Sequence, residues 1–307
     1  MRKAFSETLL QLAEENPRVA LLTGDLGFQV FDDFRTRFGP RYLNVGVAEA
    51  ALVSVAAGMA MERWRPFAYS IASFITGRAF EQIRLLVDYP NLPVIIAGGG
   101  GGTTYASSGI THIAAEDIAL MSVLPNMTVV NPGDPNEIRE LMPQLLKLPG
   151  PSYLRVGRYG EPTYQAVDPV ILGKARFVID GEGVAIISTG DIVLVVLQAL
   201  NMLKENQIFP IVYQMHTVKP LDTTVLSLLT KRVHTIVVVE ESFPSGGLAS
   251  AISAWFVQRR GSPRVLRLGP PDALALGNLP RDELRHHFGY DAEGIVFACR
   301  SALNSSK

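Results

Sequence analysis

Short runs of apolar, often β-branched residues alternate with stretches of helical periodicity along most of the chain. Uniformly apolar strands separated by helices are typical of parallel sheets covered on both faces, because such strands have no solvent-facing side. We therefore predict an α/β fold with two parallel or mixed sheets. The expected strands are residues 19–23, 94–97, 127–130, 184–188, 210–213, 235–239 and 265–268, and the clearest helices are residues 135–148, 193–205 and 247–258.

The length of 307 residues suits two domains at about 100–200 residues each. The least periodic stretch lies between Arg158 and Gly183 and is interrupted by several prolines and glycines. We expect a first α/β domain over residues 1–165, a linker over 166–182 and a second, smaller domain over 183–307.

Composition excludes several classes of protein. The 28 basic and 29 acidic side chains leave no basic excess for nucleic-acid binding, which draws mainly on phosphate neutralisation. The single cysteine, Cys299, excludes an internal disulfide framework and fits a reducing cytoplasm. The stretch 45–61 is apolar, but it falls short of the roughly 20 residues of a membrane span and contains Glu49. No targeting segment is visible, and we expect a cytoplasmic protein without a membrane partner.

Glu49 is the most informative single residue, because it is the only charged side chain in the stretch 45–61. Burying an isolated carboxylate is costly, so such a group usually has a partner. Two interpretations stay open on this context alone. Glu49 is either a functional carboxylate or an inert acidic residue placed favourably at the start of a helix.

The segment around Glu49 reads Asn-Val-Gly-Val-Ala-Glu-Ala over residues 44–50, and Val-Ala-Ala-Gly-Met-Ala follows over residues 55–60. This pattern resembles the pyrimidine-binding segment of transketolases and of the C-terminal half of deoxyxylulose-phosphate synthases. The resemblance implies that thiamine diphosphate is the cofactor and that Glu49 bonds N1′ of its aminopyrimidine ring. The cofactor would supply the difficult chemistry, and the protein would supply orientation and this proton contact.

Two further segments extend the resemblance across the first domain. The opening of the chain, up to Thr-Gly-Asp-Leu-Gly at residues 23–27, is similar to the start of the family's pyrimidine domain and places Asp25 and Leu26 at the cofactor. Residues 74–84, Phe-Ile-Thr-Gly-Arg-Ala-Phe-Glu-Gln-Ile-Arg, resemble the segment whose aromatic side chain stacks on the pyrimidine. Phe74 is the expected stacking residue, with Ile75 the alternative register, and Arg78 is assigned to the cofactor site. Without the resemblance, Phe74 is an ordinary core aromatic.

The segment Ser-Gly-Ile-Thr-His at residues 108–112 follows a glycine-rich stretch, where active-site loops concentrate. The family pattern at this place is Asp-Gly-Pro-Thr-His, and it implies that His112 contacts substrate and takes part in catalysis. Ser108 stands where the family has an aspartate that reads a sugar hydroxyl, so the usual sugar phosphates are in doubt. The five glycines at residues 98–102 lack the pattern of a phosphate loop, and we expect a flexible segment there.

Arg155 and Arg158 fall at the end of an expected strand, where ligands of α/β folds collect. Arginine suits bidentate recognition of a phosphate. The resemblance assigns Arg158 to the substrate phosphate. Arg155 is a second candidate for substrate binding, or else an ion-pair residue.

The second half resembles the transketolase C-terminal domain in the segments 188–190, 215–222, 239–242 and 246–250. That domain packs at a subunit interface in the family, so His216 is not expected to be catalytic. The adjacent pair His286 and His287 is not expected to bind a metal, because neighbouring side chains on a helix point apart.

A full transketolase also has a domain that holds the cofactor's diphosphate through a divalent metal and carries Gly-Asp-Gly and a later Asn. This sequence contains no Gly-Asp-Gly. The resemblance therefore implies a split enzyme, in which a separate N-terminal (α) subunit supplies that domain and holds Mg²⁺ or Ca²⁺. The expected assembly is an α₂β₂ heterotetramer built on a homodimer of this chain.

The leading hypothesis is a transketolase-type transferase that moves a two-carbon ketol unit from a ketose or ketose phosphate to an aldehyde. A β subunit of a 2-oxoacid dehydrogenase shares the two-domain plan and is the alternative among enzymes. A non-catalytic regulatory paralogue is the third hypothesis, motivated by Ser108. The intact Glu49 argues against it.

Overall fold

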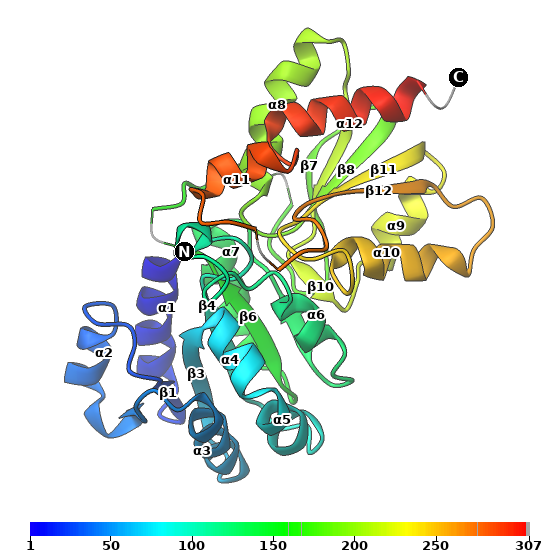
Figure 1. Cartoon of the computed structure of the whole chain (residues 1–307). Helices are drawn as coiled ribbons and strands as arrows, with labels where there is room; N and C mark the ends of the chain where they lie inside the picture. Colours follow the sequence, from blue (N-terminus) through cyan, green and yellow to red (C-terminus); the bar gives the residue numbers. More distant parts are fainter. Residues whose placement is uncertain (159, 167, 275, 305–307) are drawn as a thin grey trace.

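The computed structural model describes residues 1–158, 160–166, 168–274 and 276–304. Its two sheets are each covered by helices on both faces, and one sheet lies above the other in Figure 1. The predicted α/β class with two mostly parallel sheets is confirmed.

The first sheet has seven strands in the order β10-β5-β6-β4-β3-β1-β2. All neighbouring pairs are parallel except β10, which runs antiparallel to β5. The bounds are β1 Val19–Thr23, β2 Tyr42–Asn44, β3 Arg65–Ile71, β4 Ile95–Gly99, β5 Thr128–Val130, β6 Ser152–Val156 and β10 Thr217–Lys219.

The second sheet has five strands in the order β12-β11-β8-β9-β7, and only β7 runs antiparallel to its neighbour. The bounds are β7 Arg176–Ile179, β8 Gly183–Ser188, β9 Ile211–Gln214, β11 Val233–Val239 and β12 Arg264–Leu268. Two strands cross the expected partition of the chain. β7 lies within the expected linker, and β10 belongs to the second half of the sequence but completes the first sheet.

Helices fill both faces of each sheet. On the first sheet, α1 (Arg2–Glu15), α2 (Asp32–Arg37) and α7 (Pro135–Leu146) cover one face, and α3 (Glu49–Met61), α4 (Ala72–Arg78), α5 (Phe80–Gln82), η2 (Ile83–Asp88) and α6 (Asp117–Ser122) cover the other. On the second, α8 (Val193–Glu205), α11 (Arg281–His287) and α12 (Ala292–Asn304) lie opposite α9 (Thr223–Leu229) and α10 (Leu248–Val257). Two short turns, η1 (Gly39–Arg41) and η3 (Ala106–Ser108), complete the elements.

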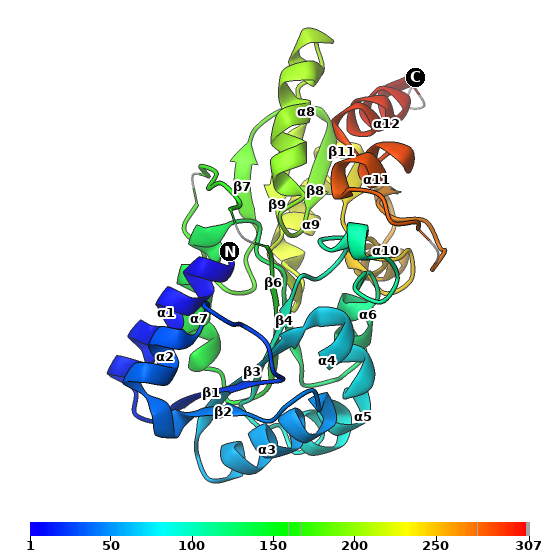
Figure 2. The same cartoon turned by 60° about the vertical axis from the view of Figure 1, so that its left-hand side comes forward.

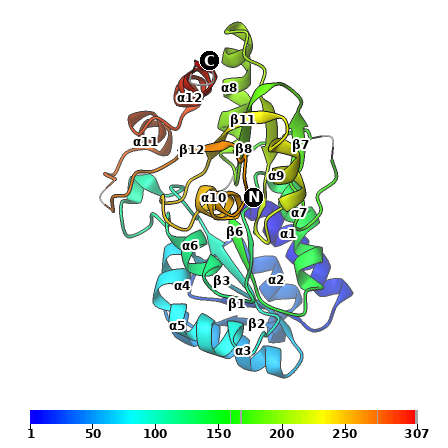
Figure 3. The same ribbon diagram turned by 90° about the vertical axis from the view of Figure 1, so that its right-hand side faces the viewer.

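The two layers share a hydrophobic core. One continuous cluster joins the α3 and α6 side of the first sheet to the α9 and α10 side of the second. Figure 3 shows α6 and α10 side by side at this junction, where Gly246 before α10 packs on Ala119 of α6. The second sheet is therefore packed directly on the elements that follow β4 and β5. Within the described ranges, no helix is long and apolar enough to cross a membrane.

Candidate active site

The residues expected at the site follow the carboxyl ends of strands in the first sheet. Asp25 and Leu26 follow β1, Glu49 follows β2, Phe74 and Arg78 follow β3, Ser108 and His112 follow β4, and Arg158 follows β6. These strands are mutually parallel, so their carboxyl ends meet at one edge, where α/β folds bind their ligands. Arg155 is the exception, because it lies within β6.

Glu49 is the first residue of α3 and is only 3% exposed. Its Oε1 accepts a hydrogen bond of 3.0 Å from the Ser70 hydroxyl, and its Oε2 lies 3.2 Å from Nη1 of Arg78. A carboxylate in the first turn of a helix is also favoured by the helix dipole. The partner that a buried carboxylate requires is therefore present, and Ser70 is a contact that sequence reasoning missed.

Phe74 is half-buried and faces the same groups. The Arg78 guanidinium carbon lies 4.1 Å from the centre of its ring, and the ring centre of His112 is 5.2 Å away in an edge-on contact. Ile75 is fully buried in the core. Of the two stacking candidates, only Phe74 presents its side chain at this edge of the sheet.

Asn44 holds the ends of β1 and β2 together beside Glu49. Its amide nitrogen donates to Oδ1 of Asp25 at 3.0 Å, and its amide oxygen accepts from the backbone N–H groups of Asp25 and Gly46, each at 3.0 Å. Asp25 is exposed and has a φ of 57°, a conformation that costs energy for a residue other than glycine. Leu26 beside it is half-buried. This loop is therefore held in a defined shape at the expected cofactor edge.

His112 comes from the loop between β4 and α6. It is partly exposed, and its Nδ1 lies 2.9 Å from the Thr111 hydroxyl. Its ring also makes an edge-on contact of 6.2 Å with Tyr105. Ser108 is exposed at the end of η3 in the same loop.

Arg158 is exposed just beyond β6, and Arg2 lies next to it. The backbone N–H of Arg2 donates to the carbonyl oxygen of Arg158 at 3.1 Å, and the Arg2 guanidinium donates to the hydroxyl of Tyr105. Two cations thus stand on neighbouring backbone segments near the His112 loop. Sequence reasoning missed Arg2, although the resemblance covers the segment in which it lies.

Arg155 is buried and directed into the protein rather than towards solvent. Its Nε lies 2.9 Å from Oδ2 of Asp117, and its Nη2 pairs with Oδ1 of the same carboxylate. Burial alone would lower the pKa of Arg155, but the Asp117 carboxylate outweighs this effect and raises it. Because Arg155 is only 5% exposed and engages both oxygens of Asp117, the ion-pair interpretation is favoured over substrate binding.

The glycines at residues 98–102 are buried and closely packed, so the expected flexibility is wrong. A Cβ on Gly98 would lie 2.5 Å from the Tyr153 hydroxyl, and one on Gly101 would lie 2.4 Å from the Arg155 side chain. Glycine is needed here because other side chains approach the backbone directly.

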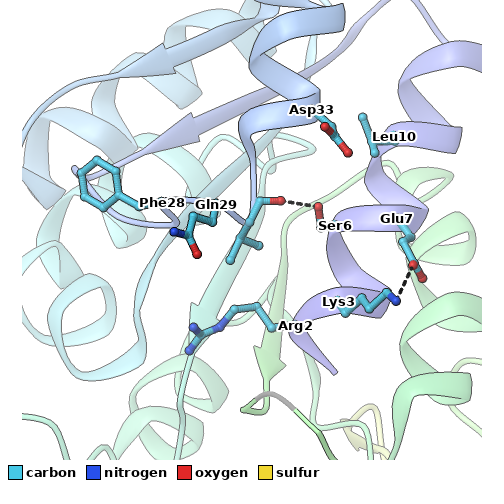
Figure 4. A pocket seen from close by; sticks show the side chains of 9 residues that line it. Arg2, Lys3, Ser6, Glu7, Leu10, Phe28, Gln29 and Asp33 are labelled. Carbon is cyan, nitrogen blue, oxygen red and sulfur yellow. Dashed lines mark hydrogen bonds and ion pairs between the residues drawn. The ribbon is translucent and has the colours of Figure 1, made fainter.

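A cavity of about 540 Å³ opens between α1 and the segment that follows the Asp25 loop (Figure 4). Its lining includes Arg2 and Lys3 but also Glu7 and Asp33, and Lys3 pairs with Glu7 at 3.6 Å. This mixed charge selects no ligand class, and none of the residues expected from the sequence lines the cavity.

The remaining histidines considered above lie in the second half. His216 is fully buried, and burial lowers its pKa to about 3. His286 pairs with Asp291 at 2.7 Å, and Glu293 offers a further carboxylate within 4.8 Å of both. Asp291 also accepts the Gly294 N–H at the start of α12, so it has a structural use without any metal.

Comparison with known proteins identifies the family. Residues 1–160 match the transketolase pyrimidine binding domain. The chain belongs to the transketolase family. Residues 173–295 match the transketolase C-terminal domain. Transketolases with this pyrimidine-binding domain form a thiamine diphosphate enzyme family.

Individual relatives place the chain among split transketolases. It is 32% identical over 309 residues to one subunit of the apulose-4-phosphate transketolase of Phocaeicola vulgatus, covering 100% of this chain and 97% of the relative. A solved split gene transketolase, an inactive beta4 tetramer, is 34% identical with a TM-score of 0.89 over 99% of this chain and 98% of that chain. The chain also resembles the 1-deoxy-D-xylulose-5-phosphate synthase 1 of Geobacter sulfurreducens, at 34% identity, but spans only 47% of that protein. The transketolase and split-subunit predictions are confirmed at the level of family.

Proposed function

We propose that this chain is the β subunit of a thiamine diphosphate-dependent split transketolase, which transfers a two-carbon ketol unit from a ketose or ketose phosphate to an aldehyde. The observation that carries the proposal is the buried Glu49 carboxylate at the start of α3, beside a half-buried aromatic ring at the carboxyl edge of a parallel sheet. When bound, thiamine diphosphate supplies the nucleophilic carbon and the electron sink for breaking the bond next to a ketone.

The residues present fit the aminopyrimidine end of that cofactor. Glu49 offers a carboxylate that can accept or share one ring proton, and Ser70 fixes the orientation of that carboxylate. Phe74 offers an aromatic face for stacking. Arg78 now covers this face and pairs with Glu49. Because its side chain is 52% exposed, Arg78 can move aside to admit a ring and then hold its edge. The Asp25–Leu26 loop borders the same space.

The substrate side is assigned to the loop after β4 and to the cations beside it. His112 can donate to or accept from a sugar hydroxyl, since it is partly exposed and its Nδ1 is engaged by Thr111. Arg158, joined by Arg2, can bind a phosphate through charge-assisted hydrogen bonds. Ser108 replaces a carboxylate with a neutral hydroxyl. We therefore expect a sugar whose hydroxyl pattern differs from that of the common pentose and hexose phosphates.

A partner subunit is required by this proposal, because the diphosphate and its Mg²⁺ or Ca²⁺ would be held by an α subunit. Exposed apolar side chains before and at the end of α3 and after η2, which packs on α3, support such a contact: Val47 is 70% exposed, Met61 is 71% exposed and Tyr89 is 82% exposed. The relatives point the same way, since one is a single subunit of a transketolase and the solved split gene transketolase is inactive as a beta4 tetramer. The proposed assembly is α₂β₂.

Co-expression with an α subunit that carries the Gly-Asp-Gly and Asn pattern tests the proposal. The purified complex, loaded with thiamine diphosphate and Mg²⁺, should transfer a ketol unit from a ketose phosphate to an aldehyde, and the chain alone should not. Turnover of a 2-oxoacid instead would assign the dehydrogenase-type alternative. A complex that does not bind thiamine diphosphate and turns over neither a ketose phosphate nor a 2-oxoacid would support the regulatory paralogue instead.

A further inference from the structure

The second domain contacts the loop that carries His112 at several residues, and Glu241 makes the buried charged contact among them. Glu241 follows β11 and is 3% exposed. Its Oε2 accepts a 3.3 Å hydrogen bond from the backbone N–H of Thr103, which belongs to the loop between β4 and α6. Figure 2 shows this loop rising from the first sheet towards α11.

Glu241 contacts the loop at the place where its two ends, Gly102 and Ala114, come together; we call this place the neck of the loop. Gly102 and Ala114 pair there through two backbone hydrogen bonds of 3.1 and 2.8 Å. Gly102 lies so close to Glu241 that a Cβ would come within 2.8 Å of the Glu241 carbonyl oxygen. One residue past Ala114, the carbonyl oxygen of Ala115 accepts the Phe243 N–H at 2.9 Å. His112 is only two residues before Ala114, so a shift of the neck moves its imidazole.

Two arginines hold Glu241 in place. Arg281 donates from Nε to Oε1 at 3.0 Å, and Arg285 donates from Nε to the same oxygen at 2.8 Å. Arg281 is itself fixed by both oxygens of Asp191, at 2.6 and 2.7 Å. Burial alone would raise the pKa of Glu241, but the two guanidinium charges outweigh it and keep the pKa well below its ordinary value.

The first domain meets this cluster from the other side. Nη1 of Arg155 donates to the Glu241 carbonyl oxygen, and its Nη2 donates to the carbonyl oxygen of Ala114, both at 3.4 Å. The chain of contacts therefore runs from Asp117 through Arg155 to Glu241 and on to Arg281. The Asp117–Arg155 ion pair and the ion pairs of the Glu241 carboxylate are therefore joined through the main-chain carbonyl of Glu241, next to the loop neck.

We infer that Glu241 is a positioning residue, which holds the loop between β4 and α6 so that His112 stands at the substrate. The second domain thereby acts on the site without contributing a group that touches substrate. The substrate part of this inference rests on the proposed function. The mechanical part, that Glu241 fixes the loop, does not.

Hydrogen exchange of the full-length chain tests the mechanical part directly. Glu241→Gln keeps the shape but removes the charge that Thr103 and the arginines share. Backbone amides of residues 102–114 should exchange about tenfold faster, the effect expected when a charged hydrogen-bond acceptor becomes a neutral one. The matched control is Glu240→Gln, because Glu240 is equally buried and pairs with Arg267 but accepts from Leu248 and Ala249 in α10 instead of from the loop.

Loop exchange within about twofold of wild type in Glu241→Gln, or equal acceleration in Glu240→Gln, would overturn the inference. If Glu241→Gln does not fold, Glu241→Asp decides, because it keeps the negative charge but is one methylene shorter, which takes the carboxylate out of reach of the Thr103 N–H. This variant should accelerate amide exchange in the same loop, and unchanged exchange rates there would refute the inference that Glu241 holds the loop.

Activity of the αβ complex tests the substrate part separately. Glu241→Gln should raise the KM for the aldehyde acceptor while leaving the affinity for thiamine diphosphate unchanged. Faster loop exchange with an unchanged KM would show that the loop is held by Glu241 but does not position His112. Failure of the wild-type complex to turn over would count against the proposed function and not against the exchange result.

Discussion

Replacing Arg155 and Arg158 in parallel separates an interior ion pair from a substrate contact. The two arginines are three residues apart, and both are candidates for phosphate binding from the sequence. In the structure Arg155 is 5% exposed and paired with Asp117, whereas Arg158 is exposed. Arg155→Met leaves the Asp117 carboxylate buried without its cation. Breaking a buried pair in this way costs about 3–5 kcal/mol.

That cost converts into a shift of the melting temperature. At about 2.1 cal/mol/K per residue, 307 residues give an unfolding entropy of roughly 0.6 kcal/mol/K. The Tm of Arg155→Met should therefore fall by about 5–8 °C, measured by calorimetry at a fixed protein concentration. Adding Asp117→Asn should recover at least about half of the loss, because the pair then leaves no uncompensated charge.

Arg158→Met is the matched control. An exposed substitution normally changes stability by no more than about 0.5 kcal/mol, so its Tm should move by less than about 1 °C. In the αβ complex it should instead raise the KM for a phosphorylated substrate. The reasoning is refuted if Arg155→Met melts with wild-type Tm and raises that KM as Arg158→Met does.

Three further outcomes are expected. Ser108→Asp should shift acceptor preference towards ordinary sugar phosphates in the αβ complex, and an unchanged substrate profile would remove Ser108 from the specificity argument. His216 has a folded pKa of about 3 against an ordinary 6.5, so the unfolded chain takes up the proton first and stability is lost as pH falls through this window. The free energy of unfolding should fall by about 1.4 kcal/mol per pH unit within this window. Urea titrations at pH 7 and pH 5 should show a smaller fall in His216→Asn than in wild type, and an equal fall in both would contradict the burial argument. Cys299 is fully buried and burial raises the pKa of its thiol to about 12, so a thiol reagent at pH 8 should label it only after unfolding.

The regular parts of the fold could be predicted from periodicity. The helix expected at residues 193–205 is α8, and the apolar runs at residues 19–23, 184–188 and 235–239 are strands β1, β8 and the end of β11. β3 was missed because it begins with Arg65 and Pro66 and carries a serine near its end, which hides a buried central strand. β10 was missed because it spans only three residues and pairs across the two halves of the chain.

The site could be predicted as a set of positions but not as a set of contacts. Local motifs identified Glu49, Phe74 and His112, and the structure places all three after the carboxyl ends of parallel strands in the first sheet. The sequence could not reveal Ser70 as the partner of Glu49, since that contact depends on the unpredicted β3. It also could not show that Arg155 points inward, because the register of a strand decides which side its residues face.

The central claim, that Glu49 activates a bound cofactor, is tested most directly by Glu49→Gln in the αβ complex. The matched control is Glu137→Gln, since Glu137 is also a buried carboxylate in the first turn of a helix with an arginine partner, Arg176 at 3.2 Å. Assembly and folding should survive in Glu49→Gln while ketol transfer falls by about 10²–10⁴-fold, the usual contribution of a proton-transfer group. The control should keep its turnover per folded complex. A Glu49→Gln complex that retains more than roughly a tenth of wild-type turnover would contradict the account.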